Sequence, residues 1–504
     1  MRRFRNLFVL ALVVCLSAAA LAQAARTEIV ILHTNDTHAR LQPIMVGDQQ
    51  RGGMARIAGF VQVLRSLYPG RVLWLDAGDT IHGTNVANLF YGESVVEMLN
   101  AAGVAAMTLG NHDFNYGQEV LLARIAEANF PILGANIVYS ESGRPFAGQS
   151  AVFELDGVTV AVLGLSTQDT PIVTHPKNVV GLTFRDPVEV AKELVPVLDA
   201  QADVVVVLSH LGFDEDLRLA RSVSGIDLIV GGHSHTQLDE PVVVGDTVIV
   251  QANEYGKFLG FVKLTVENGN VVDVVGQLLP ITADAPVDVT IQGIIDRWEQ
   301  RLDAQLDQVV GEALVDLNGE RQFVRTGETN LGNLVADILR ETVGADIGLT
   351  NGGGIRASIA VGPVTLRDIY TVLPFDNILV GIELTGEQIL AALEHSVSAY
   401  PAQLGGFLQV SGLTFTFDAS KPAGQRVVEV LVGGEPLDLK QVYRVATNDF
   451  LAAGGDGYEI FVGARQFYGT QMADGEFLRD VVAAYFREHG VVAPQVEGRI
   501  KVIE

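Results

Sequence analysis

Five short apolar runs in the first half of the chain are each followed by residues that can bind metal ions. The runs occupy residues 28–33, 72–76, 105–109, 204–208 and 226–230. The side chains that follow them are those of Asp36, His38, Asp79, Asn111, His112, His210, His233 and His235. Carboxylate and amide oxygens together with imidazole nitrogens form a donor set that suits divalent metal ions. Their ordered recurrence predicts a metal site.

The apolar runs predict the elements that bring these side chains together. They are short, rich in β-branched residues and closed by Gly, Asn or Asp, which is typical of strands. Their nearly continuous hydrophobicity predicts a sheet buried on both faces. Loops at the carboxyl ends of such strands gather ligands and catalytic groups in α/β proteins. We therefore expect five loops to converge on one site.

Each motif alone has a simpler explanation. The spacing of Asp36 and His38 is common in turns, and Asp79 by itself is equally well explained as a helix N-cap. Asn111 is a sharper signal, because an amide oxygen is an uncommon metal ligand. The adjacent His112 can either bind a metal or transfer a proton. The alternative for the whole set is a binding module that has kept the fold and lost its ions.

The N-terminus has the features of a targeting segment. Three arginines precede an apolar stretch over residues 7–21, and Ala24 ends a small-residue cleavage site, which predicts a signal peptide over residues 1–24. The stretch is short for a transmembrane helix, so we expect no membrane anchor after cleavage. The protein is then exported, to the periplasm, the cell surface or the medium. Cys15, the single cysteine, lies in this segment, so the exported chain forms no disulfide.

The exported chain is strongly acidic. The full chain of 504 residues has 34 basic and 60 acidic residues, a net charge of -26. The signal peptide holds three of the basic residues and none of the acidic ones, so its removal gives -29. Such a charge disfavours nucleic-acid polymers and anionic membranes as partners. It still allows a small phosphate ester, because bound metal ions supply local positive charge.

The pattern of elements divides the chain into two α/β domains. Alternating strands and amphipathic segments place the first domain at residues 26–279. Apolar residues at helical spacing predict an interdomain helix over residues 287–309, and the second domain follows over residues 311–502. Within the second domain we expect helices at 330–343 and 386–398 and strands at 413–417 and 427–432.

The ordered motifs resemble those of the calcineurin-like metallophosphoesterases: Asp-x-His, Gly-Asp-x-x-x-Gly, Gly-Asn-His-Asp, Ser-His and Gly-Gly-His-x-His. The second half resembles the substrate-binding domain of the 5′-nucleotidase family, which includes UDP-sugar hydrolases and ecto-5′-nucleotidases. The matching stretches begin at Asn351, Leu373, Glu394, Gly406 and Asn448. The resemblance implies a metallophosphoesterase β-sandwich flanked by helices, a connecting helix and a C-terminal α/β substrate-binding domain.

The resemblance also implies roles for the metal-binding residues. One divalent cation would be held by Asp36, His38, Asp79 and His235. A second would be held by Asp79, Asn111, His210 and His233, so that Asp79 bridges the two ions. The donor set suits Zn, Mn, Fe or Co. His112 would be a catalytic residue and not a ligand.

Asn115 departs from the family pattern. Several 5′-nucleotidases have an Asp three residues after the catalytic histidine, and this chain has Asn115 as the partner of His112. The carbonyl oxygen of the amide can orient the ring, but it cannot stabilise an imidazolium as a carboxylate does. An Asn at this place resembles the 2′,3′-cyclic-nucleotide phosphodiesterases, which also have 3′-nucleotidase activity.

In the second domain, the resemblance assigns four residues to the substrate. Phe407 and Phe450 would clamp the nucleobase between two aromatic faces, in the way that aromatic side chains stack on bases generally. Asp456 would accept hydrogen bonds from the ribose, and Arg356 would bind the phosphate through its two-pronged guanidinium. For both phenylalanines, core packing is the alternative.

The sequence therefore predicts an exported dinuclear-metal phosphohydrolase that acts on small nucleotides, either 5′-nucleotides or UDP-sugars. One alternative is a 2′,3′-cyclic-nucleotide 2′-phosphodiesterase with 3′-nucleotidase activity. The other is a non-catalytic nucleotide-binding surface protein. No arginine lies between Arg367 and Arg426, where some members of the family have further ones, so we expect phosphate recognition to differ in this chain.

Overall fold

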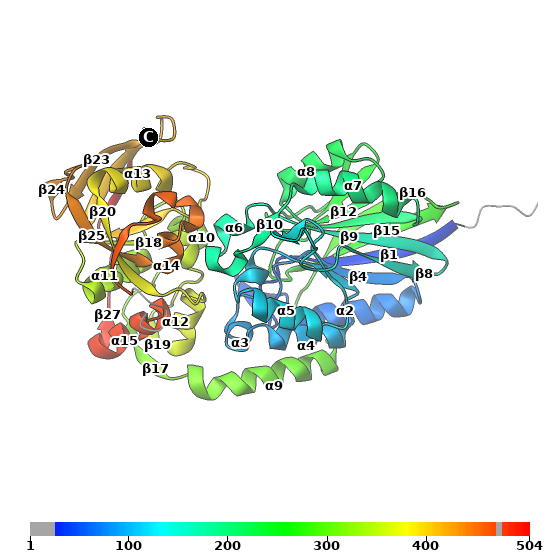
Figure 1. Cartoon of the computed structure of the whole chain (residues 1–504). Helices are drawn as coiled ribbons and strands as arrows, with labels where there is room; N and C mark the ends of the chain where they lie inside the picture. Colours follow the sequence, from blue (N-terminus) through cyan, green and yellow to red (C-terminus); the bar gives the residue numbers. More distant parts are fainter. Residues whose placement is uncertain (1–25, 470–475, 504) are drawn as a thin grey trace, which may run out of the picture.

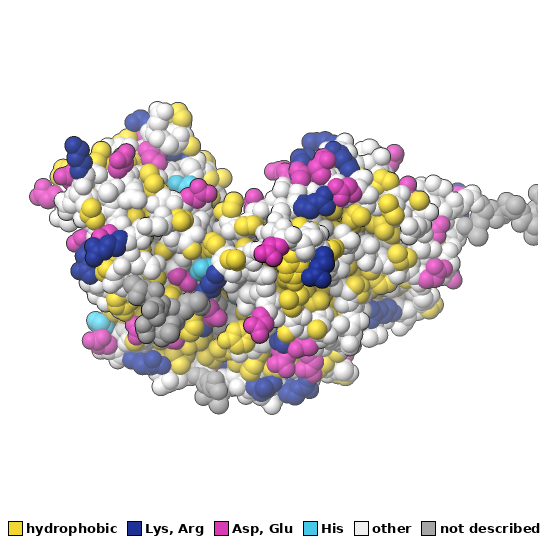
Figure 2. All heavy atoms as spheres, viewed as in Figure 1, with side chains coloured by type: hydrophobic (Ala, Val, Ile, Leu, Met, Phe, Trp, Pro, Cys, Tyr) yellow, Lys and Arg dark blue, Asp and Glu magenta, His cyan; other side chains and the backbone are white. Residues whose placement is uncertain are grey.

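The computed structural model describes residues 26–469 and 476–503, which form two lobes joined by a long helix (Figure 1). The signal peptide expected over residues 1–24 lies outside the described residues. Figure 2 shows that the surface is notched between the two lobes and that acidic side chains are spread over both. Within the described ranges, no helix combines the length and the apolar character that crossing a bilayer requires.

Two six-stranded sheets face each other in the N-terminal lobe. The first has the order β16 (Asn270–Pro280), β15 (Phe258–Glu267), β1 (Arg26–Thr34), β4 (Val72–Asp76), β5 (Ala106–Thr108) and β6 (Ile132–Leu133). The second has the order β13 (Val242–Val244), β14 (Thr247–Val250), β12 (Leu228–Gly231), β11 (Val204–His210), β9 (Val158–Ser166) and β8 (Ser150–Leu155).

Side-chain alternation explains why the strand sequences are apolar throughout. In β1, Ile29 and Ile31 enter the core between the two sheets, where they meet Val206 and Leu208 of β11. The intervening side chains of β1 belong to a second core, which helices cover on the outer face of the first sheet. Since successive side chains of a strand point to opposite faces, a strand buried on both sides needs apolar residues at every position. The buried sheet predicted from the five runs is confirmed.

Helices cover the outer faces of both sheets (Figure 1). The first sheet is covered by α2 (Met54–Leu67), α3 (Asn85–Asn88), α4 (Glu93–Ala102) and α5 (Gln118–Glu127), and the second by α7 (Pro187–Asp199) and α8 (Phe213–Ser222). The remaining elements of this lobe are β2 (Ile44–Val46), β3 (Gln49–Arg51), η1 (His112–Phe114), β7 (Ile137–Tyr139), α6 (Thr170–Val173), η2 (Pro176–Val179) and β10 (Leu182–Phe184).

The connecting helix α9 (Val289–Leu306) is shorter than the interval expected for it. It begins at Val289 because the side chain of Asp288 accepts the N–H groups of Thr290 and Ile291, which caps the helix. The chain returns to a strand at Val309, where β17 begins. The buried Trp298 fixes α9 to the N-terminal lobe through a hydrogen bond from its Nε1 to Glu97, 2.8 Å long.

The C-terminal lobe is a second α/β unit. Its central sheet has the order β21 (Leu408–Ser411), β18 (Ile347–Asn351), β25 (Val442–Asn448), β20 (Leu379–Thr385) and β26 (Arg465–Tyr468). Two smaller sheets contain β19 (Gly362–Thr365), β17 (Val309–Ala313) and β27 (Val491–Val492), and β24 (Glu435–Pro436), β23 (Val427–Val432), β22 (Leu413–Asp418) and β28 (Ile500–Ile503). The helices are α10 (Arg321–Val324), α11 (Asn330–Val343), η3 (Gly352–Gly354), α12 (Leu366–Val372), α13 (Gly386–Ser396), α14 (Asp449–Ala452), η4 (Gly455–Gly457), η5 (Glu459–Phe461) and α15 (Leu478–His489). The α/β sandwich with a second α/β unit is the fold class that the sequence predicts.

The topology brings the five loops to one edge. Strands β1, β4 and β5 are parallel neighbours in the first sheet, and β11 and β12 are parallel neighbours in the second. Parallel strands end at the same edge of their sheet, so the residues that follow them meet there. The C-terminal lobe closes over this edge.

Candidate active site

One group of donor atoms comes from the loops after β1 and β12. His38 Nε2 lies 3.2 Å from His235 Nε2, and the latter lies 3.2 Å from Asp36 Oδ1. Burial lowers the pKa of His38 well below its ordinary value, so its imidazole is neutral and offers a lone pair at neutral pH. Two imidazole nitrogens and a carboxylate oxygen converging on one point fit a divalent cation.

A second group lies beside the first and contains Asp79, which also approaches His38 of the first group. Asp79 Oδ2 is 3.3 Å from His210 Nε2 and 3.9 Å from His38 Nε2. His233 completes this group, and burial followed by His210 lowers its pKa to about 4. Although burial opposes it, His210 holds the pKa of Asp79 well below the ordinary range, so the carboxylate stays ionised.

Two orphaned polar atoms test whether a cation fits the second group. Asn111 Oδ1 and His210 Nε2 are buried and make no hydrogen bond within the described residues, although the anionic Asp79 Oδ2 lies 3.3 Å from His210 Nε2. A buried polar atom left unsatisfied costs about 1–3 kcal/mol, and such atoms are rare in folded proteins. Both atoms belong to residues predicted as ligands, so a bound cation would satisfy them together. The residues present therefore fit a metal ion at this place.

Most of the predicted ligands have a left-handed backbone. Positive φ angles occur at Asp36 (47°), His38 (45°), Asp79 (55°), His233 (71°) and His235 (56°). Residues other than glycine rarely adopt this conformation, which costs of order 1–3 kcal/mol each and persists only where the surroundings impose it. The loops around the site therefore hold these side chains against their local preference.

Glycines make room for this arrangement. A Cβ on Gly110 would lie 2.2 Å from Asp79 Oδ1, and a Cβ on Gly232 would lie 2.7 Å from the main-chain oxygen of Ala77. Neither distance is tolerable, so a side chain at either position would displace the atoms that it meets. The glycines next to the metal-binding residues are thus required by close approach of the chain.

A second layer of contacts orients the ligands. His210 Nδ1 lies 2.7 Å from the main-chain oxygen of Ala77, and His235 Nδ1 contacts Glu254. These contacts leave Nε2 of each ring free for a metal. The buried carboxylate of Asp113 accepts the backbone N–H groups of Asp79, Thr80, Ile81 and Gly110. Asp113 therefore shapes the Asp79 loop and is not the partner of His112.

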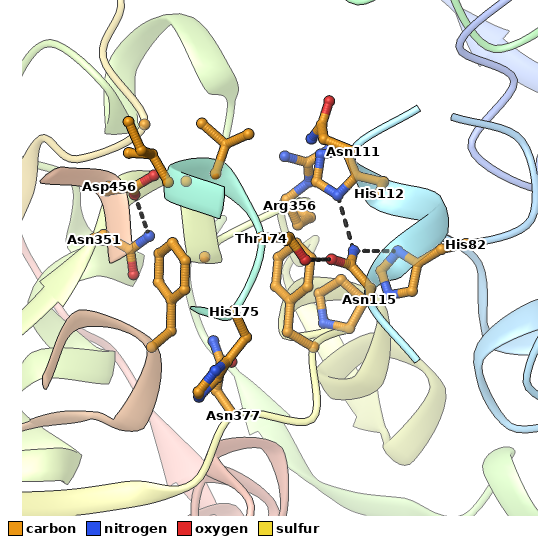
Figure 3. Close-up of a pocket in the computed structure, with 18 of the residues that line it drawn as sticks. His82, Asn111, His112, Asn115, Thr174, His175, Asn351, Arg356, Asn377 and Asp456 are labelled. Carbon is orange, nitrogen blue, oxygen red and sulfur yellow. Dashed lines mark hydrogen bonds between the residues drawn. The ribbon is translucent and has the colours of Figure 1, made fainter. Parts of the chain in front are cut away.

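His112 contacts Asn115, as Figure 3 shows. Asn115 Nδ2 is 2.9 Å from His112 Nδ1 and 3.1 Å from His82 Nδ1. Its Oδ1 accepts a hydrogen bond of 2.9 Å from the hydroxyl of Thr174. The sequence predicts that the carbonyl oxygen of Asn115 orients the ring. The structure corrects this, because Thr174 occupies that oxygen and the amide nitrogen faces His112.

A cavity of about 340 Å³ connects the metal-binding residues to the C-terminal lobe. His112, Arg356, Phe450 and Asp456 all line it. Asp456 Oδ2 accepts a hydrogen bond of 2.7 Å from Asn351, and its backbone φ is 52°. The two lobes thus contribute to one pocket, with metal-binding groups at one end and Phe450 and Asp456 at the other.

Two family models match the chain. One, described as calcineurin-like phosphoesterase, matches residues 29–237, and the other, described as 5′-nucleotidase C-terminal domain, matches residues 309–463. A 5′-nucleotidase from Diplobatis ommata is 33% identical over 98% of this chain and 93% of its own length. The chain belongs to the 5′-nucleotidase family.

Further relatives agree with this assignment. The structure of a 5′-nucleotidase precursor from Thermus thermophilus is 38% identical, with a TM-score of 0.85, and the match covers 95% of this chain and 100% of that one. The trifunctional nucleotide phosphoesterase protein YfkN of Bacillus subtilis is 36% identical over 94% of this chain, which spans 35% of that protein's length. Members of the 5′-nucleotidase family are metal-dependent phosphoester hydrolases, and this chain is one of them.

For this 5′-nucleotidase family member, the structure places Phe407 in the interior of the C-terminal lobe. Its ring is 1% exposed and packs in the core of the C-terminal lobe with Phe415 and Phe417. Hydrogen bonds fix its backbone, because its oxygen accepts the N–H of Gly352 at 2.7 Å and its N–H donates to Leu404. These bonds fix the position of the main chain at Phe407. Phe450 belongs to the same cluster of apolar residues and lines the cavity, so the base clamp stays a prediction.

Phe450 and Phe407 can be distinguished by substitution. We expect Phe450→Ala to raise the KM for AMP roughly 5- to 150-fold, which corresponds to the about 1–3 kcal/mol that stacking on a base contributes. Phe407→Leu should leave KM within twofold and lower the unfolding free energy by about 1–3 kcal/mol, because it opens a cavity in the core. Steady-state kinetics and urea unfolding measure the two effects. An equal rise in KM for both variants would instead support a clamp formed by both rings.

Two arginines at α10 are functional candidates that no sequence motif predicts. Arg321 and Arg325 line the cavity together with Arg356. Arg321 Nη1 lies 3.2 Å from His235 Nδ1, across the boundary between the lobes. Burial, followed by the charge of Arg356, lowers the pKa of Arg325 to about 9, so it remains a cation at neutral pH. The segment between Arg367 and Arg426 contains no arginine, and the two arginines at α10 supply positive charge to the cavity instead.

Proposed function

We propose that this protein is an exported phosphohydrolase with two metal ions that converts nucleoside 5′-monophosphates to nucleosides and inorganic phosphate. The observation that carries the proposal is that residues of both lobes line the cavity described above. Its metal-binding end and the side chains suited to a nucleoside are on opposite lobes, so one nucleotide would span both. The small-molecule nucleotide substrate agrees with the family of the chain.

The metal site would hold two ions with Asp79 between them. Asp36, His38 and His235 would bind the first, and Asn111, His210 and His233 the second. Zn, Mn, Fe and Co all suit this mixture of nitrogen and oxygen donors. When bound, two such ions supply Lewis-acid charge for the phosphoryl oxygens and make water a stronger nucleophile at neutral pH.

The remaining residues would bind and orient the substrate. Arg356 and Arg325 would hold the phosphate, Asp456 the ribose hydroxyls, and Phe450 one face of the base. Hydrolysis breaks the bond between phosphorus and O5′, while water supplies the new oxygen on phosphorus. His112 would donate a hydrogen bond to the reacting phosphate or to O5′, which takes up a proton as it leaves.

Export remains part of the proposal. It is supported by the basic and apolar segment over residues 1–24 and by one relative being described as a precursor. N-terminal sequencing of the protein recovered from the periplasm or medium tests it. A chain that begins at residue 25 is expected, and retention of the full N-terminus in the cytoplasm would refute it.

The contact of Asn115 with His112 favours a second candidate. A neutral amide in place of a carboxylate resembles the 2′,3′-cyclic-nucleotide phosphodiesterases, so a cyclic nucleotide or 3′-nucleotide is the alternative substrate. UDP-sugars are a further extension of the first proposal, because three arginines line the cavity. Hydrolysis of any of these compounds would exclude a non-catalytic nucleotide-binding protein.

One substrate panel separates these possibilities. Metal-stripped protein is reloaded with Mn²⁺ or Zn²⁺ and incubated with AMP, 3′-AMP, 2′,3′-cyclic AMP and UDP-glucose, and products are followed by chromatography. We expect AMP to have the highest kcat/KM. A higher value for 2′,3′-cyclic AMP would replace the proposal with the phosphodiesterase. Binding of AMP without turnover of any compound would leave only the binding protein.

A further inference from the structure

The segment formed by α6 and η2 lies where the two lobes meet (Figure 1). Thr174, at the C-terminal end of α6, is 1% exposed and lines the cavity. Its hydroxyl donates to Asn115 Oδ1 at 2.9 Å. The next residues, His175 and Lys177, extend toward the C-terminal lobe. The segment therefore contacts both the catalytic neighbourhood and the other lobe.

Thr174 decides which end of the Asn115 amide faces His112. With its oxygen bonded to the hydroxyl, the amide presents its nitrogen to Nδ1 of His112 and of His82, as the dashed lines in Figure 3 show. The same segment also holds the backbone of Asn115, whose oxygen accepts a hydrogen bond of 3.0 Å from Asn178 Nδ2. Without the hydroxyl, the amide could rotate by half a turn and exchange a donor for an acceptor. The ring orientation of His112 would then no longer be unique.

The segment is anchored on the C-terminal lobe beside Phe450. His175 Nε2 lies 3.0 Å from Asp449 Oδ2, and Lys177 Nζ lies 3.5 Å from the same oxygen. The other carboxylate oxygen of Asp449 accepts the N–H of Ile378 at 2.9 Å, which fixes the carboxylate. The rings of His175 and Phe450 are 6.5 Å apart, centroid to centroid. The position of Thr174 therefore depends on how the C-terminal lobe is seated.

We propose that Thr174 is a positioning residue that fixes His112 through Asn115, and that the contact of His175 with Asp449 couples this positioning to the docked C-terminal lobe. The chain of contacts runs from Asp449 through His175, Thr174 and Asn115 to His112. The docked arrangement of the lobes that a nucleotide seated against Phe450 favours is therefore also the arrangement that orients His112. The inference rests on the phosphohydrolase activity proposed above.

The experiment compares two threonines of the same segment. Thr174→Val removes the hydroxyl that contacts Asn115. Thr170→Val is the matched control, because Thr170 is equally buried and its hydroxyl donates to the main-chain oxygen of Thr167. We expect Thr174→Val to lower kcat about 10- to 100-fold, because a contact that orients the catalytic neighbourhood is lost. KM and metal content should stay within twofold of wild type. Thr170→Val should stay within twofold, and Thr174→Ser should restore kcat.

A double-mutant cycle separates positioning from a general loss of structure. In an Asn115→Ala background, Thr174→Val should have no further effect, because its action passes through the amide. His175→Ala should lower kcat roughly 2- to 30-fold in the native background and leave it unchanged in the Asn115→Ala background. All variants are assayed on the substrate that wild type cleaves best. A wild-type protein that turns over no substrate would refute the proposed function. This inference alone would be overturned if the effects of Thr174→Val and Asn115→Ala on kcat multiplied, or if the two valine variants lowered kcat equally.

Discussion

Asp79→Asn is expected to lower kcat at least roughly 10³-fold and to reduce the metal content from two ions per chain to one or none. The substitution keeps the shape of the side chain and removes the negative charge that is proposed to lie between the two ions. Metal ions contribute several kcal/mol of transition-state stabilisation in phosphoester hydrolysis, and each 1.36 kcal/mol corresponds to a factor of about ten. Phosphate release and metal analysis by inductively coupled plasma mass spectrometry measure the two effects.

Asp227→Asn provides the control for a lost carboxylate in the same lobe. Asp227 precedes β12 and accepts the N–H of Val205 at 2.8 Å, at the start of β11. His210 and His233 lie at or beyond the other ends of these two strands, so Asp227 lies away from the site. We expect this variant to keep both metal ions and activity within twofold. If Asp79→Asn also kept both ions and its activity, a shared Asp79 would be excluded.

The second large effect is expected for His112→Ala. A side chain that assists proton transfer contributes typically about 10²- to 10⁴-fold, so kcat should fall by that factor. KM and metal content should change little, because His112 is assigned to the reacting phosphate and not to a metal. Kinetics with AMP and metal analysis of the same preparation measure this.

The metal content of this variant shows whether His112 is a metal ligand. Donor atoms of His38, Asp79 and His112 also lie close enough together to surround an ion. However, Nδ1 of His112 contacts Asn115, and its ring is 5.1 Å from that of His38. Loss of one metal ion in His112→Ala would make His112 a ligand and remove it from the role proposed here.

The electrostatics of the pocket explain how a strongly acidic chain can bind an anionic substrate. The net charge of the full chain is -26, whereas Arg321, Arg325 and Arg356 all line the cavity. Arg356 also lies over the ring of Phe375, which stacks on His82. The lobe that carries the arginines thus reaches the histidines of the other lobe. A local cationic wall opposes the overall charge where the phosphate would lie.

The sequence determined the strands and the order of the metal-binding residues. Strands such as β4 and β11 are recognisable because burial on both faces requires an apolar residue at each position, and β4 has the bounds expected from its run. Convergence of the loops then follows from parallel pairing, which places all strand ends at one edge. The helix α11 also has its predicted bounds, since its cap residue Thr329 and the terminal Gly344 are local signals.

The tertiary structure decided the features that depend on contacts distant in sequence. The orientation of the Asn115 amide is set by Thr174, which is 59 residues away. Phe407 follows a Gly-Gly pair in a family motif, and only the tertiary packing shows that it lies in the apolar core of the C-terminal lobe. The left-handed backbone of Asp79 and His233 is likewise imposed by surrounding loops. Local sequence encodes residue type and periodicity, whereas side-chain direction and strain arise from neighbours that folding brings together.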